Sequence, residues 1–345
     1  MILKNKLIYI WIALSILLIS LFVSDIFLGS VNIPVKEVFR AIFTGETHKP
    51  EFLTIIYRFR IPKALTALFA GFALSVSGLQ MQTIFRNPLA GPFVLGISAG
   101  ASLGVAILIM GMSVFTVVAQ VGIVGNWVIV IAAWLGSGLI LFLILAVSLR
   151  VKDIMTILIL GIMFGNATSA IVSILQYFSS ESMLKAFVVW TMGSLGGVSI
   201  AQLKVLIPSV FVGLIITFFS IKMLNAMLVG ENYAKSMGLN IRLSRFMIFF
   251  STSLLAGSIT AFCGPIGFIG IAVPHIARII FKTANHKILL PGSMLIGGIV
   301  LLLSDIVSQI PGKENTLPIN SITALVGIPI VIWIIIKNEK MSRVS

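Results

Sequence analysis

The chain alternates long apolar runs with short polar segments. The apolar runs cover residues 7–28, 64–85, 93–118, 127–149, 154–178, 205–221, 246–263, 266–281, 288–309 and 322–336. Most of them are close to the roughly 20 residues that a helix needs to cross the hydrocarbon core of a bilayer. The pattern therefore predicts an all-α integral membrane protein, a single transmembrane domain over residues 1–345 with about ten spanning helices.

The composition narrows the protein class further. Hydrophobic residues make up 59% of the chain and charged residues 10%, against about 25% charged residues in an ordinary soluble domain. The mean hydropathy is +1.15. These values exclude a soluble enzyme and a disordered protein, and the single cysteine, Cys263, excludes a disulfide scaffold.

The distribution of basic residues predicts the orientation of the chain. The net charge of +14 comes from 24 Lys and Arg against 10 Asp and Glu. In a soluble protein this excess would suggest nucleic acid, but beside membrane spans it is typical of cytoplasmic flanks. Placing both termini in the cytoplasm puts most basic residues inside. We therefore expect a multi-pass protein of the cytoplasmic (inner) membrane that contacts lipid and no nucleic acid.

Two similar segments lie half a chain apart. Gly91-Pro92 and Gly264-Pro265 each open a short Gly- and Ile-containing stretch, and the predicted topology places them on opposite sides of the membrane. An inverted repeat with a pseudo-twofold axis gives this arrangement. The abundance of glycine and proline makes about one Gly-Pro pair expected by chance, so the similarity is weak support by itself.

The chain lacks sequence motifs for nucleotide binding and for metal binding. It contains no G-x-x-x-x-G-K-[ST] phosphate loop, and its three histidines have no metal-ligand spacing, so we expect no cofactor or metal. Few ionisable residues lie inside the apolar runs, and Asp305 is the one good candidate for a functional carboxylate, although helix packing or capping is its simpler role. The scarcity of such residues weighs against an ion-coupled secondary transporter and against an intramembrane enzyme.

Charged residues gather at the ends of two predicted spans. Arg58, Arg60 and Lys63 lie where the outer loop, residues 29–60, enters the second span. They are either interfacial side chains that reach toward water or an electropositive rim that attracts an acidic soluble partner. Residues 230–240, between the sixth and seventh spans, form either a plain loop or a short surface helix offered to a cytoplasmic partner.

Several motifs follow one another along the chain in a familiar order. They are Arg60-Ile61-Pro62-Lys63, Ser77-Gly78-Leu79-Gln80, Arg86-Asn87-Pro88-Leu89-Ala90-Gly91-Pro92, Leu95-Gly96-Ile97-Ser98-Ala99-Gly100, Gly264-Pro265-Ile266-Gly267, Val273-Pro274-His275 and Leu317-Pro318-Ile319. Together they resemble the FecCD-type permeases, the membrane subunits of ABC importers for iron–siderophores, haem and cobalamin. The likeness extends over nearly the whole chain.

The resemblance implies an architecture and a set of partners. It implies the fold of a type II ABC importer permease, with ten helices, that forms a homodimer with the pathway at its interface. It also implies an ABC ATPase dimer on the cytoplasmic side, which binds ATP and Mg²⁺, and an extracytoplasmic substrate-binding protein. On this basis the chain itself is not an enzyme.

The resemblance also implies roles for particular residues. Docking of the binding protein falls on Arg60 and Lys63, with Arg58 beside them. Coupling to the ATPase falls on the cytoplasmic segment 230–240, with Gly230, Glu231, Ala234, Lys235, Gly238 and Leu239. Pathway or structural-motif roles fall on Asn87, Pro88, Gly264, Pro265, Gly267, Pro274, His275, Trp190 and Asp305.

Two positions depart from the family pattern. Gly91 stands where the family often has Asp or Glu, and Gln309 stands where the cobalamin branch has a further basic docking residue. The expected function is ATP-driven import of an iron chelate by alternating access, with iron–siderophore as the default cargo. The alternatives are haem or cobalamin import and, with less support, an ion-coupled secondary transporter.

Overall fold

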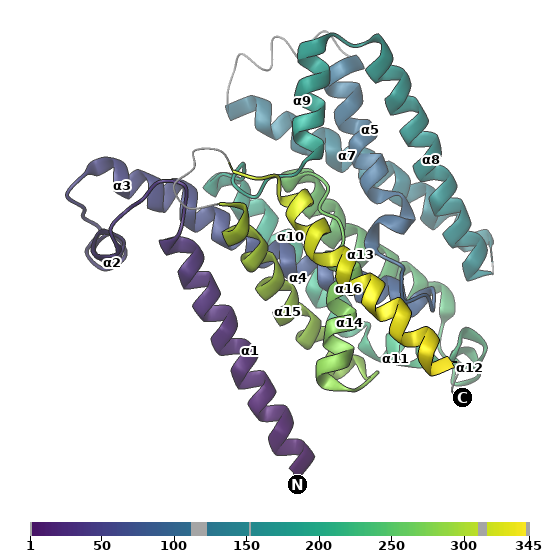
Figure 1. Cartoon of the computed structure of the whole chain (residues 1–345). Helices are drawn as coiled ribbons and strands as arrows, with labels where there is room; N and C mark the ends of the chain where they lie inside the picture. Colours follow the sequence, from purple (N-terminus) through teal and green to yellow (C-terminus); the bar gives the residue numbers. More distant parts are fainter. Residues whose placement is uncertain (1, 112–122, 152, 310–315, 343–345) are drawn as a thin grey trace.

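The computed structural model describes residues 2–111, 123–151, 153–309 and 316–342, and within these ranges the chain is helical with no β-strand (Figure 1). The longer helices are α1 (Ile2–Phe27), α4 (Ile61–Ile84), α7 (Ile123–Arg150), α8 (Ile154–Phe178), α10 (Ile200–Phe219), α13 (Ile241–Cys263), α15 (His286–Ser308) and α16 (Ile319–Ser342). The shorter ones are α2 (Val35–Thr44), α3 (Pro50–Ile55), η1 (Ile56–Arg60), η2 (Pro92–Leu95), α5 (Ile97–Ala106), η3 (Ile107–Gly111), α9 (Glu181–Thr191), α11 (Ile221–Val229), α12 (Glu231–Ser236) and α14 (Ile269–Phe281).

The predicted all-α membrane fold is confirmed. Seven helices of the described chain are long and apolar enough to span a membrane, and three shorter apolar helices cover residues 97–111, 269–281 and 319–333. These ten elements fall on the ten apolar runs. The part of the third run at 112–118 lies outside the described residues. Helix α1 begins and α16 ends at the same end of the bundle (Figure 1), as an even number of spans requires.

The helix that carries the second span begins earlier than the apolar run. An uninterrupted helix of 35 residues extends from Pro50 to Ile84, through a π-helical turn at η1, so the last part of the predicted outer loop is helical. The predicted outer loop also contains helix α2, which contacts the π-helical turn: the hydroxyl of Tyr57 donates a hydrogen bond to the carbonyl of Ala41. The helix can continue through two arginines because the charge of Arg60 is satisfied inside the protein.

The core of the bundle consists of α4, α13, α14 and α15, with α1 running along α15 at the periphery (Figure 1). Backbones in this core approach closely: a Cβ atom on Gly78 would overlap the backbone of Gly270. The hydrophobic effect does not drive helices together in lipid, so close van der Waals packing between backbones, which small residues allow, stabilises such crossings. Helices α5, α7, α8 and α9 form a second group beside this core.

Candidate functional site

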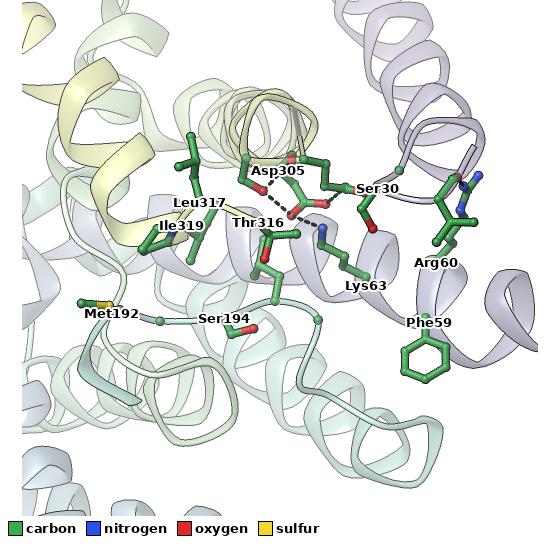
Figure 2. Close-up of a pocket in the computed structure, with 18 of the residues that line it drawn as sticks. Ser30, Phe59, Arg60, Lys63, Met192, Ser194, Asp305, Thr316, Leu317 and Ile319 are labelled. Atoms are coloured by element: carbon green, nitrogen blue, oxygen red, sulfur yellow. Dashed lines mark hydrogen bonds and ion pairs between the residues drawn. The ribbon is translucent and has the colours of Figure 1, made fainter. Parts of the chain in front are cut away.

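A cavity of about 430 Å³ lies at the end of the bundle where α1 stops, which we call the outer end after the predicted orientation (Figure 2). Its walls come from distant parts of the chain: the linker after α1, the start of α4, the linker after α9, the end of α15 and the start of α16. The polar lining is Ser30, Arg60, Lys63, Ser194, Asp305, Ser308, Gln309 and Thr316. The cavity therefore brings three of the predicted site residues together.

Arg60 holds the end of α1. Its guanidinium donates hydrogen bonds to the carbonyl oxygens of Ile26 and Phe27, at 2.9 and 2.8 Å, and to that of Val31. The last carbonyls of a helix have no hydrogen-bond partner within the helix and carry a partial negative charge. The guanidinium of Arg60 donates hydrogen bonds to these carbonyls, and its positive charge is favourable beside them. The linker must pass close to this side chain, and Gly29 leaves room where a Cβ atom would meet the guanidinium.

Lys63 forms an ion pair inside the cavity. Its Nζ atom lies 3.1 Å from Oδ1 of Asp305, whose side chain is only 1% exposed. The amide of Gln309 donates to Oδ2 of Asp305 at 2.8 Å and to Oδ1 of Asp25 at 3.2 Å. Four polar side chains thus join α1, α4 and the end of α15 into one buried cluster, which we call the outer cluster (Lys63, Asp305, Gln309 and Asp25).

The three basic residues predicted for docking occupy different environments. Arg58 is exposed, Arg60 is buried on carbonyl oxygens, and Lys63 is 16% exposed and paired with Asp305. Sequence reasoning did not identify Asp25 as a partner of Gln309. The position of Asp25 within an apolar run, like that of Asp305, was the available signal.

The Gly-Pro segment after α13 supports the wall of the cavity. The carbonyl of Cys263 accepts a hydrogen bond from the N–H of Ser194 at 2.8 Å, and Asn320 accepts one from the N–H of Gly267 at 2.9 Å. Gly264 has a φ of +73°, and a Cβ atom there would collide with the carbonyl oxygen of Trp190. Gly264, Pro265, Gly267 and Trp190 therefore meet where α9, α13 and α16 converge.

The first Gly-Pro segment contacts α14 near the opposite end of the bundle. Asn87 accepts a hydrogen bond from the N–H of Leu89, which forms a tight turn, and the carbonyl of Pro88 lies 2.8 Å from Nε2 of His275. Pro274 and His275 are both buried in α14. These four predicted motif residues are thus brought together across 187 positions of sequence.

The predicted coupling segment, residues 230–240, contains a short helix and is not a plain loop. Helix α12 starts after Gly230, whose φ is +133°, and ends where the N–H of Leu239 bonds to the carbonyl of Ala234. Gly238 closes the turn with a φ of +82°. Ala234 is buried, whereas Asn232, Tyr233 and Lys235 are exposed.

An ion pair fastens α12 to the bundle. Arg245 of α13 donates from Nε to Oε1 of Glu231 at 2.8 Å and from Nη2 to Oε2. The same guanidinium donates to the carbonyl of Val151 at 3.2 Å. A second cavity, of about 520 Å³, opens beside this contact. Sequence reasoning named Glu231 but missed Arg245, which lies five residues beyond the segment.

Asp153, near this end of the bundle, has a shifted pKa. Asp153 begins α8 and accepts hydrogen bonds from the N–H and the hydroxyl of Thr156, at 2.8 and 2.7 Å. These bonds stabilise the carboxylate and lower the pKa of Asp153. The described residues contain no group of three or more His, Cys, Asp or Glu side chains placed to bind a metal ion.

Comparisons with known proteins identify the family of the chain. The model of the FecCD transport family matches residues 16–337. The vitamin B12 import system permease protein BtuC of Salmonella typhi is 34% identical over 286 residues, covering 83% of this chain and 84% of the relative. BtuC of Escherichia coli O6:H1 is 34% identical over 297 residues, covering 86% and 88%.

A solved structure is similar over nearly the full length. It is a metal-chelate type ABC transporter in an inward-facing conformation, with a TM-score of 0.82 and 28% sequence identity, covering 95% of this chain and 99% of that one. The resemblance inferred from the sequence motifs is thereby confirmed. The chain belongs to the FecCD transport family and is a membrane permease subunit of an ABC importer.

Proposed function

We propose that the chain forms the membrane path for a metal chelate, with corrinoids of the vitamin B12 class as the first candidate cargo. The supporting observation is the 34% identity to vitamin B12 import permeases over more than four fifths of both chains. Iron–siderophore import, the default expectation from the sequence, is the second candidate, because the similar solved structure is a metal-chelate type transporter.

Reconstitution separates these candidates. The permease, its ATPase and its binding protein are placed in proteoliposomes, and ATP-dependent uptake of cyanocobalamin, a ferric siderophore and haem is measured. We expect cyanocobalamin to accumulate. Accumulation of the ferric siderophore alone would establish the second candidate, and uptake driven by an ion gradient without ATP would overturn the importer mechanism.

We infer that the pathway runs along α8 at the interface of a homodimer. Few residues of α8 are buried, and its exposed surface carries Asn166, Ser169 and Ser173. Spacings of three and seven residues place these polar groups on one helical face. Polar groups facing lipid hydrocarbon are unfavourable, so a water-filled path or a second protomer is the better environment. Asn166→Leu should reduce uptake, whereas the apolar control Ile171→Leu should not.

Docking of the binding protein on the outer end is proposed to use Arg58 as its exposed cation. Arg60 and Lys63 then shape the surface from inside, through their bonds to α1 and to Asp305. Charge reversal by Arg58→Glu should weaken docking at low salt, because rim charges act mainly on association. Unchanged association rates would remove Arg58 from the docking surface.

Coupling to the ATPase is proposed to use the exposed face of α12. Closure of the ATPase dimer would push on α12, and the Glu231–Arg245 pair would pass the movement to α13. Removing this ion pair should lower uptake while ATP hydrolysis continues. This proposal also requires the cytoplasmic placement of both termini, which accessibility labelling of cysteines added after α16 can test.

A further inference from the structure

Helix α2 presents three faces with different chemistry. Glu37, Val38 and Ala41 are buried against the protein. Lys36, Arg40 and Thr44 form an exposed polar face, and Val35, Phe39, Ile42 and Phe43 form an exposed apolar face. At 3.6 residues per turn, the apolar residues fall within an arc of about 100°, directly beside the basic residues. An exposed apolar face on a helix of ten residues that does not span the membrane needs a partner.

The apolar face is large and continuous with α1. The side chains of Phe43 and Val35 are 78% and 59% exposed. The ring of Phe39 lies 6.1 Å from that of Phe43 and 5.1 Å from that of Phe27, the last residue of α1. Because α1 is a candidate membrane span that ends at Phe27, this aromatic row starts where the span ends.

The helix is held in position by contacts on its buried side. Glu37 accepts a hydrogen bond from the N–H of His48 at 2.9 Å, and the hydroxyl of Tyr57 donates to the carbonyl of Ala41 at 3.1 Å. Figure 1 shows α2 projecting sideways from the bundle, beside the end of α1. These contacts fix the exposed faces of α2 beside the end of α1, a candidate membrane span.

We propose that α2 is an interfacial helix that inserts its apolar face into the lipid surface and binds anionic phospholipid head groups through Lys36 and Arg40. An amphipathic helix with aromatic residues on one side and basic residues beside them is suited to the boundary between acyl chains and head groups. The position of α2 and the continuity with α1 favour a bilayer over a soluble protein. The proposal does not depend on the cargo or on the orientation of the chain.

Spin-label depth measurement tests the insertion. Phe43→Cys on the apolar face and Thr44→Cys on the polar face are labelled separately in the full chain, reconstituted in phosphatidylcholine vesicles. The native Cys263 is buried, and the unlabelled background is checked on the unsubstituted protein. We expect the ratio of oxygen to nickel-chelate collision rates to be several-fold higher at 43 than at 44. Val35→Cys gives a second reporter on the apolar face if Phe43→Cys does not fold.

Equal ratios at the apolar and polar positions would overturn the proposal. So would an apolar face that becomes protected only when the binding protein is added, since its occupant would then be that protein. Adding phosphatidylglycerol should increase the depth of the label at 43 if anionic head groups are bound. Lys36→Glu should abolish this increase, whereas Lys185→Glu, a matched change at an exposed lysine of α9, should leave it unchanged.

Discussion

Two ion pairs, one near each end of the bundle, have similar chemistry and different surroundings. At the outer end, Lys63 is 16% exposed and Asp305 is 1% exposed, and the pair joins two long helices. At the other end, Arg245 is 5% exposed but Glu231 is 27% exposed, and the pair joins a long helix to the six-residue α12. The outer pair connects two long helices inside the protein, and the inner pair attaches the short helix α12 to α13 near the surface.

Burial determines what each pair contributes. Removing one partner of a fully buried pair leaves a charge that water cannot reach, which costs far more than the pair itself contributes to stability. Where the remaining charge keeps another hydrogen-bond partner, as Arg245 does with the carbonyl of Val151, losing the ion-pair partner costs less. The outer pair should therefore govern stability, and the inner pair should govern function with a small effect on stability.

The largest effect is expected from removing the outer cation. Lys63→Met leaves Asp305 and Asp25 buried together without their nearest ammonium group and should lower the free energy of unfolding by about 3–5 kcal/mol. The unfolding transition of the purified protein in mixed SDS and detergent micelles measures this change.

A double substitution provides the control for the loss of charge. Lys63→Met together with Asp305→Leu removes both charges and should recover most of the lost stability, because buried ion pairs are often replaceable by apolar residues. If Lys63→Met alone is as stable as the unsubstituted protein, the ion pair does not contribute to stability in the way that its burial predicts.

Loss of the hydrogen bonds from Arg60 to the end of α1 should have the next largest effect. Arg60→Gln removes a charged donor from the end of α1 and leaves carbonyls of Ile26 and Phe27 without their partner, at a cost of roughly 2–3 kcal/mol. Arg58→Gln is the matched control on the adjacent exposed face, with no measurable cost expected. Equal unfolding transitions for the two variants would contradict the buried role of Arg60.

The bridging amide should matter less than either cation. Gln309→Leu removes one neutral donor that serves both Asp305 and Asp25 and should cost about 1–2 kcal/mol. Gln309→Glu keeps the shape but adds a third acidic group, so it should be less stable than Gln309→Leu. The reverse order, measured in the same unfolding assay, would show that the amide is not a required donor.

The spans were predictable from sequence because their signal is local. A run of about 20 apolar residues has a single low-energy form in lipid, since only a helix satisfies all of its backbone groups. The early start of the helix that carries the second span was not predicted, because Arg58 and Arg60 interrupt the apolar pattern. The carbonyls of α1 that accept from Arg60 are some 30 positions away, and no local pattern reports them.

The candidate site was predictable only residue by residue. Family motifs identified Lys63, Asp305 and Glu231, but their partners depend on which helices lie side by side. Asp305 is 242 positions from Lys63, and Gln309 is 284 positions from Asp25. Arg245 is closer to its partner, at 14 positions from Glu231, yet nothing in the spacing distinguishes it from the neighbouring Arg242. The pseudo-twofold inverted repeat and the docking and coupling roles stay predictions.

The smallest effect on stability is expected at the inner pair. Glu231→Gln removes the charge but keeps a side-chain oxygen that can accept from Arg245, whose guanidinium also donates to the carbonyl of Val151, so the free energy of unfolding should fall by only about 1 kcal/mol. Uptake should nevertheless fall several-fold while ATP hydrolysis by the assembled importer continues, because α12 loses its charged attachment to α13. The control is Lys222→Gln, a charge change at an exposed side chain of α11 outside residues 230–240. If Glu231→Gln destabilises the protein as much as Lys63→Met, the contrast between the two ends fails. If uptake and hydrolysis fall together, the pair serves assembly with the ATPase, and the movement reaches α13 by another contact.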